Sequence, residues 1–358
     1  MESEIMTSKM QPDEQTSVLN EPTIAQQLGW ISERYDIIAS ARFGRGDIEQ
    51  EWHLGGTEPR ICRYCNQGAP VVSFVQKAHA LPGLIGNQWL FDLQECDQCN
   101  ALFGSTIDAH FGRWSASWRA LERTPNREGA SPKYSAHDGT IQIESDDSNQ
   151  MTIVEGMSGA GRYTIDPEAG VIEFKLTRRG FAPSAVFKCL VKMAISVAPP
   201  ETSESLKLLK GWIRGDAESS EAFADVLLVL FVQTRPAVHA PGRFDYQLLR
   251  RKPEAPTDSP YMFFRLRFGG RAYQIALPLL AEDAGQPKDK VPKLPMLPGD
   301  IEAIGDLTQS AVPIKLENMS SSEIVGREDI VLRYGASTFQ ELDSSQFQLL
   351  ASRGGKQK

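Results

Sequence analysis

Apolar residues recur with helical spacing in the first part of the chain, directly after a polar leader. The stripe is formed by Ile24, Leu28, Ile31, Tyr35 and Ile38. This spacing predicts an amphipathic helix over residues 23–42 that is capped by Thr23 and packs on the cysteine-rich stretch behind it. Residues 1–22 are polar and show no apolar period, so we expect a flexible leader there.

The following segment changes to the order strand, loop, strand, helix. The two strands are predicted at residues 71–75 and 89–91, and the helix starts near Asn100. Residues 124–138 are polar and carry turn-forming residues, which predicts a linker. The first domain is therefore expected to span residues 23–123.

Strands and helices alternate in the remaining residues, 139–350, without the regular rhythm of βαβ units. Strands are predicted at residues 140–144, 151–155, 162–165, 171–176, 312–316 and 330–334. Strands 261–268 and 271–280 are expected to form a hairpin, because the paired glycines between them supply the positive φ of a tight turn. The pattern predicts an α+β fold class, with a larger mixed C-terminal domain.

Two helices are predicted inside this second domain. The first runs from Ser184 to before Pro199, and the second covers residues 203–213. On the first helix we expect the narrow polar stripe of Lys188, Lys192 and Ser196 to face water while the other faces are buried.

Composition sets few limits on function. The chain has 358 residues, 41% hydrophobic and 23% charged, which is typical of a globular protein of about two domains. No secretion signal is present and the longest apolar run, residues 226–232, is too short to cross a membrane, so a soluble cytoplasmic protein is expected. The net charge is −8, but the leader carries half of it, so a nucleic-acid partner is not excluded.

Four of the five cysteines fall in two pairs that are separated by 30 residues. They are Cys62, Cys65, Cys96 and Cys99. Two such pairs can close a tetrahedral Zn²⁺ site, whereas two disulfides or free thiols are the alternatives. A cytosolic environment keeps thiols reduced, which favours zinc.

A zinc ion held by four thiolates has no open position, so any chemistry must come from the residues that it places. His79 ends the predicted strand segment, and Asn100 follows the last cysteine directly. A histidine can take a proton from water, and a hard divalent cation can stabilise the charge that develops during phosphodiester hydrolysis.

These blocks resemble the zinc-supported type of HNH endonuclease. The resemblance covers about residues 60–112 and rests on the cysteine pairs, the sequence Ala-His-Ala-Leu-Pro around His79, and Asn100. It implies a ββα-metal fold, with His79 as general base and Asn100 as a ligand of Mg²⁺ or Mn²⁺. The family's middle asparagine has two candidates, Asp92 by spacing and Asn87 by residue type.

The sequence departs from the family at Ala78, where many relatives have an acidic metal ligand. His110, Asp108 or Asp92 could supply the missing ligand. The architecture resembles bacterial defence nucleases, which implies an anti-phage effector that a partner or ligand licenses through the C-terminal domain. The alternative is a zinc-ribbon module without catalysis that binds nucleic acid or protein. DNA is favoured over RNA as the nucleic-acid partner. The sequence leaves open whether the protein forms an oligomer.

Basic residues mark candidate phosphate contacts. In the second domain they are Arg250, Arg251, Lys252, Arg265, Arg267, Arg271, Arg178 and Arg179. The default interpretation of these residues is a solvated outer face of the domain. The more specific interpretation is a row of cations that binds a nucleic-acid backbone. Arg113, Arg119 and Arg123 follow the predicted helix that starts near Asn100. They are better placed than the basic residues of the second domain to hold a nucleic-acid backbone beside the scissile bond.

Overall fold

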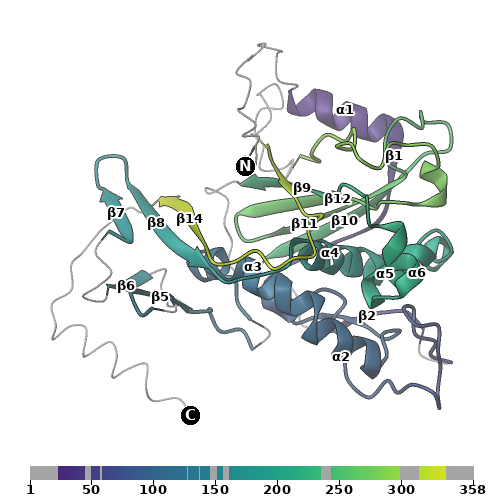
Figure 1. The fold of residues 1–358 in the computed structure, drawn as a ribbon, viewed down its shortest axis with the longest axis horizontal. Helices are drawn as coiled ribbons and strands as arrows, with labels where there is room; N and C mark the ends of the chain where they lie inside the picture. Colours follow the sequence, from purple (N-terminus) through teal and green to yellow (C-terminus); the bar gives the residue numbers. More distant parts are fainter. Residues whose placement is uncertain are drawn as a thin grey trace, which may run out of the picture.

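A six-stranded antiparallel sheet forms the centre of the molecule (Figure 1). The computed structural model describes residues 23–44, 50–56, 59–126, 128–136, 138–145, 151–155, 161–234, 243–298 and 314–335. The predicted leader, residues 1–22, lies outside this part of the chain. The strand order is β1 (Tyr35–Phe43), β10 (Phe244–Arg251), β11 (Met262–Phe268), β12 (Arg271–Ala276), β9 (Val229–Thr234) and β13 (Ile314–Asn318).

The first helix is shorter than its apolar stripe predicts. Helix α1 covers Ile24–Arg34 and begins at Thr23 with a capping box, as expected. The prediction of a helix to residue 42 is wrong, because the chain turns at once into β1, which pairs with β10 along its whole length. This pairing satisfies the backbone groups at the edge of β10, and the Tyr35 ring packs edge-on against Phe263 at 4.9 Å. Tertiary contacts thus override the local helical period.

Helices cover both faces of the large sheet. Helix α1 lies on one face, and α3 (Ile107–Leu121) and α4 (Pro183–Val197) lie on the other (Figure 1). Trp114 of α3 packs on Tyr273 of β12 with ring centroids 5.4 Å apart. One hydrophobic core includes side chains from both predicted domains, so α3 and the large sheet are packed together without a gap.

The glycine turn of the predicted hairpin is confirmed between β11 and β12. Gly269 has a φ of +57°, and a Cβ at this position would collide with the Glu122 carboxylate. Glu122 accepts hydrogen bonds from the Gly270 backbone and from Arg271. The end of α3 is therefore bound directly to the hairpin, just before the predicted linker.

Smaller elements complete the fold. Three small sheets contain β14 (Glu328–Gly335), β8 (Val171–Arg178) and β7 (Tyr163–Asp166); β4 (Tyr134–Ser135), β5 (Ile141–Ser145) and β6 (Met151–Glu155); and β2 (Trp52–Leu54) with β3 (Leu90–Asp92). The remaining helices are α2 (Asp97–Ser105), α5 (Lys207–Arg214) and α6 (Ala217–Ala222), with short 3-10 turns at Gly83–Ile85, Pro200–Thr202 and Ala281–Asp283. The fold class is α+β, as predicted. No helix in the described ranges has the length and apolar character that a membrane span requires.

The polar stripe of α4 does not face water. Lys188 is half-buried, but Lys192 is 2% exposed and Ser196 is fully buried. The prediction is wrong for these two residues because the cysteine-rich region packs on that face of α4, as the Tyr64 hydroxyl shows by its contact with the Ser196 hydroxyl at 2.6 Å.

Candidate metal centre and histidine row

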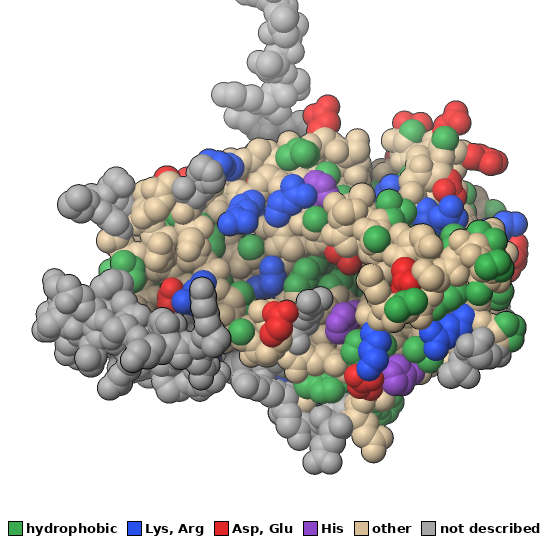
Figure 2. All heavy atoms as spheres, turned by 90° about the horizontal axis from the view of Figure 1, so that it is seen from below, with side chains coloured by type: hydrophobic (Ala, Val, Ile, Leu, Met, Phe, Trp, Pro, Cys, Tyr) green, Lys and Arg blue, Asp and Glu red, His purple; other side chains and the backbone are tan. Residues whose placement is uncertain are grey.

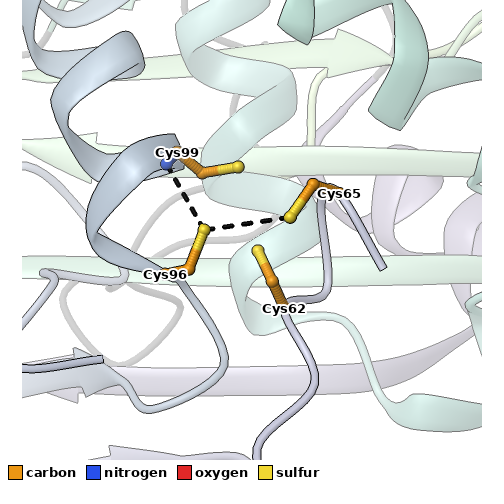
Figure 3. A group of neighbouring side chains, drawn as sticks. All are labelled: Cys62, Cys65, Cys96 and Cys99. Carbon is orange, nitrogen blue, oxygen red and sulfur yellow. Dashed lines mark hydrogen bonds between the residues drawn. The ribbon is translucent and has the colours of Figure 1, made fainter. Parts of the chain in front are cut away.

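Four cysteine sulfur atoms converge at the start of α2 (Figure 3). Cys96 is the N-cap of α2, and its Sγ accepts a hydrogen bond from the Cys99 backbone N–H at 3.4 Å. Cys62 and Cys65 come from a tight loop that the Asn66 N–H closes onto the Cys62 carbonyl at 2.9 Å. The helix start and the loop therefore present the two cysteine pairs to each other.

The sulfur geometry suits zinc. All four Sγ atoms lie within 4.8 Å of one another, and Cys65 Sγ lies 3.8 Å from Cys96 Sγ. A Zn–S bond of about 2.3 Å in a tetrahedron requires S···S edges of about 3.8 Å, whereas a disulfide requires about 2.05 Å. The predicted cysteine cluster is confirmed, and a zinc ion bound there would join the loop to α2. The fifth cysteine, Cys189, is buried elsewhere, and its Sγ lies 3.3 Å from Asp108 Oδ1.

The segment that carries His79 pairs with β3 through an isolated bridge, and this differs from the predicted strand. Residues 71–75 form a loop and not a strand, and Val71 and Val75 are 68% and 86% exposed there. The pairing begins later, where the Asp92 N–H donates to the Ala78 carbonyl at 2.9 Å and the Ala80 N–H donates to Leu90 at 3.1 Å. The bridged His79 segment, β3 and α2 therefore follow one another in the predicted order, although the first of them is a single bridge and not a strand.

Three aromatic side chains stand side by side across this small sheet. His79 pairs with Phe91 in antiparallel register, and His53 of β2 pairs with Phe91 in parallel register. The ring centroids of His79 and His53 lie 4.7 and 6.0 Å from that of Phe91. Cross-strand partners project from the same face of a sheet, so His53, Phe91 and His79 form one row, here named the histidine row.

Charged groups surround this histidine row on the surface. Lys77 Nζ donates to both carboxylate oxygens of Glu51 at 2.7 and 2.8 Å, and it lies 5.5 Å from the Phe91 ring centroid. Glu51 Oε2 also lies 3.3 Å from His53 Nε2. The hydrogen bond from Lys77 lowers the pKa of Glu51. Figure 2 shows histidine side chains beside basic and acidic ones on the lower part of the face in view.

His53 is the residue that the sequence analysis missed in this group. Its neighbours in the sequence are polar and give no strand signal, yet it belongs to β2. A three-residue strand is too short for a periodic signal, and its parallel partner β3 lies almost 40 residues away. Only the tertiary pairing reveals the row.

Asn87 is fully buried and binds the turn of the ββ hairpin. Its Nδ2 donates to the carbonyls of Leu81 at 2.6 Å and Leu90 at 2.9 Å, and its Oδ1 accepts from the N–H groups of Trp89 and Leu90. Each polar atom of the Asn87 amide is thus used by the hairpin itself. This arrangement gives Asn87 a role in fixing the segment that follows His79 against β3.

Asp92 lies in a buried ion pair. Its Oδ2 is 2.8 Å from Arg63 Nε, and its side chain is 0% exposed. Burial raises the pKa of Asp92, and the Arg63 guanidinium opposes this shift. The carboxylate is therefore directed to Arg63, beneath the surface that bears the histidine row.

Asn100 lies in the first turns of α2, beside the loop that leads to His79. Its Nδ2 is 3.5 Å from Gln76 Oε1, and Asp97 accepts the backbone N–H groups of Val75 and Gln76 at 3.0 and 2.9 Å. Asp97 therefore holds residues 75–76 on the helix start, three residues before His79. The amide oxygens of Asn100 and Gln76 are hard ligands of the kind that Mg²⁺ and Mn²⁺ prefer.

His110 points toward α4. Its Nδ1 accepts the Ala182 N–H at 2.9 Å, so only Nε2 could bind a cation. Burial and Arg113 lower the pKa of His110. Across the described ranges, the four cysteines are the only group in which three or more His, Cys, Asp or Glu ligand atoms come together. A catalytic cation at Asn100 would therefore take its other ligands from water and substrate phosphate, as Mg²⁺ commonly does.

The proposed basic track on the large sheet is absent from the described surface of β11. Arg265 is 2% exposed and lies 3.2 Å from Asp245, which also contacts Arg267 at 2.6 Å. Arg119, likewise, donates to the carbonyls of Leu84 and Gly112. The interpretation as a row of phosphate contacts is therefore wrong for these three arginines, because their guanidinium groups bind Asp245 or backbone carbonyls within the fold. Arg271 and Arg251 are similarly paired, with Glu122 and Asp283.

Residues 62–115 match the family model described as HNH endonuclease. The search of curated proteins found no match, and neither did the search of solved structures. The matched range contains the four cysteines, His79, the β3 strand and α2, and it ends within α3.

Proposed function

We propose that this protein, whose residues 62–115 are an HNH-type endonuclease domain, is a metal-dependent nuclease that hydrolyses phosphodiester bonds, with DNA as the favoured substrate. The observation that carries the proposal is the position of His79. It stands in the histidine row, on a segment that is bridged to β3 and followed by the Asn87 turn, and close in sequence to the loop bound to α2. The imidazole of His79 is half-buried in this row.

In the proposed reaction, His79 takes a proton from a water molecule. The water oxygen forms a bond to phosphorus, and the bond from phosphorus to the leaving oxygen breaks. Lys77 and His53 both contact Glu51 beside the Phe91 ring, and they would contact the non-bridging phosphate oxygens. Asn100, with Gln76 beside it, would hold a Mg²⁺ or Mn²⁺ ion, which supplies charge stabilisation when bound.

The test is cleavage of supercoiled plasmid by the full chain with Mg²⁺ or Mn²⁺, compared with His79→Ala. Loss of a general base is expected to slow cleavage by about 10²–10⁴-fold. Zinc content and thermal unfolding of both proteins show whether the variant is folded. Equal nicking by the two folded proteins would remove His79 as the base.

A non-catalytic zinc-ribbon module is the second candidate. The observation that favours it is Ala78, which is 1% exposed and places no carboxylate beside His79. This candidate requires nucleic-acid binding that survives His79→Ala and no cutting with any divalent metal. Filter binding and nicking with the same two proteins separate the candidates.

We further propose a cytoplasmic role in bacterial anti-phage defence, in which a protein partner, a ligand or oligomer formation licenses cleavage through the C-terminal region. Support comes from the architecture, since a small HNH-type domain is joined to a larger α+β region by a shared core. Phage plating on cells that express the wild type or His79→Ala tests the role. Equal plaque numbers on both strains would reject it.

A further inference from the structure

A lysine from the C-terminal region lies beneath the histidine row. Lys192 of α4 is 2% exposed, and its Nζ donates to the backbone carbonyl of His79 at 3.0 Å. The same Nζ lies 2.9 Å from Glu95 Oε2, whose side chain is 0% exposed. One ammonium group thus contacts both the backbone of His79 and the residue directly before the second cysteine pair.

A buried charge of this kind is costly unless its partners are placed well. Burial alone would lower the pKa of Lys192, but the carboxylates of Glu95 and Asp108 outweigh burial and raise it. The lysine is therefore charged in the folded protein. Burying an ion pair seldom stabilises a fold more than a well-packed apolar pair of the same volume would. Simple stability therefore does not explain why a lysine occupies this position.

The rest of the α4 face supports the same connection. Arg63 donates to the Ile195 carbonyl at 2.9 Å, one turn beyond Lys192, and the Tyr64 hydroxyl contacts Ser196. Both Arg63 and Tyr64 lie between the first two zinc cysteines. The stripe of α4 that was predicted to face water thus forms a polar contact surface for the HNH-type domain.

We propose that Lys192 is a positioning residue that fixes the backbone of His79 and makes α4 part of the nuclease site. The inference rests on the proposed function. The ammonium group is suited to this role because it has three donors on a compact charge, so it serves a carboxylate and a carbonyl at once. The C-terminal region would then influence cleavage through the placement of α4, without supplying any group that touches the substrate.

The test replaces the ion pair without leaving a buried charge. Lys192→Met alone would strand the Glu95 carboxylate, so the informative protein is the double variant Lys192→Met with Glu95→Met, in which two apolar side chains fill the site. Lys192→Arg is the second variant, since it keeps the charge opposite Glu95 but changes the donor geometry at His79. Lys188→Met is the matched control, because this lysine lies one turn earlier on α4 and its Nζ is 4.8 Å from the Trp212 ring.

The expected result is a double variant that keeps its zinc and its DNA affinity but loses kcat by about tenfold or more, with KM within about twofold. Lys188→Met should cleave at the wild-type rate. If the double variant does not fold, Lys192→Arg becomes the test of the inference. Its kcat should also fall, by less than the fall expected for the double variant. A folded double variant, or failing that a folded Lys192→Arg protein, with wild-type kcat overturns the inference.

The ring resonances of His79 give a readout that does not need cleavage. The chain has five histidines, so ¹⁵N-histidine labelling resolves them, and His79→Ala assigns the signal. We expect the His79 ring signals to move in the double variant and to stay in place in Lys188→Met. If the wild type cuts no substrate, the proposed function fails, and an unmoved His79 signal would separately reject the role of Lys192.

Discussion

Asn87 and Asn100 are expected to respond to substitution in opposite ways. Asn87→Ala removes four buried hydrogen bonds, two donated and two accepted, from the hairpin that carries His79. At about 0.5–1.5 kcal/mol per bond, the free energy of unfolding should fall by about 2–6 kcal/mol. Asn100→Ala removes one 3.5 Å contact with Gln76, so its effect on stability should stay below about 0.5 kcal/mol.

Urea unfolding followed by tryptophan fluorescence measures these differences, with equal slopes required for the comparison. In plasmid nicking, Asn100→Ala should lose cleavage while its unfolding curve is unchanged, because the proposed cation would lose its ligand. Asn87→Ala should lose activity only in proportion to its unfolded fraction and any displacement of the strand. An Asn87→Ala protein as stable as the wild type would refute the hydrogen-bond argument, and an active Asn100→Ala protein would refute the cation site.

Three further predictions concern zinc, pH and charge. Cys96→Ser should release the zinc that the wild type retains, whereas Cys189→Ala should keep it, as read by metal analysis after dialysis. Burial lowers the pKa of His110, so the unfolded chain takes up a proton below about pH 6.5 that the folded imidazole resists. The free energy of unfolding should therefore fall as pH drops from 7.5 to 6. The fall should be smaller in His110→Gln, whose amide can accept the same backbone hydrogen bond. Identical pH dependence of the two proteins would contradict this reasoning. Glu51→Gln should free the Lys77 ammonium for phosphate, which strengthens DNA binding and steepens its salt dependence; weaker binding would count against a phosphate contact there.

The candidate site could be predicted from the sequence where its residues act through local spacing. Cys62 and Cys65 share one tight loop, and Cys96 and Cys99 share one helix turn, so each pair is visible in the chain. The place of His79 beside β3 followed from the predicted order of elements, although residues 71–75 form a loop and His79 meets β3 in an isolated bridge. His53 escaped detection because its strand is defined by a distant partner.

The sequence by itself determined the cysteine cluster, the α+β class, the β11–β12 hairpin and the bounds of α4 along the chain, since spacing, turn residues and apolar periods are local properties. The tertiary structure alone decided which polar groups are buried. Residues 35–43 form a strand because they pair with β10, and Arg265 is buried because it forms an ion pair with Asp245. Lys192 is buried beneath His79 because it forms an ion pair with Glu95. Each of these outcomes depends on a partner that lies about 20 to more than 200 residues away, so no window along the chain contains it. The cost of burying an unpaired charge makes those partners decisive, and it places α4 beside the candidate site.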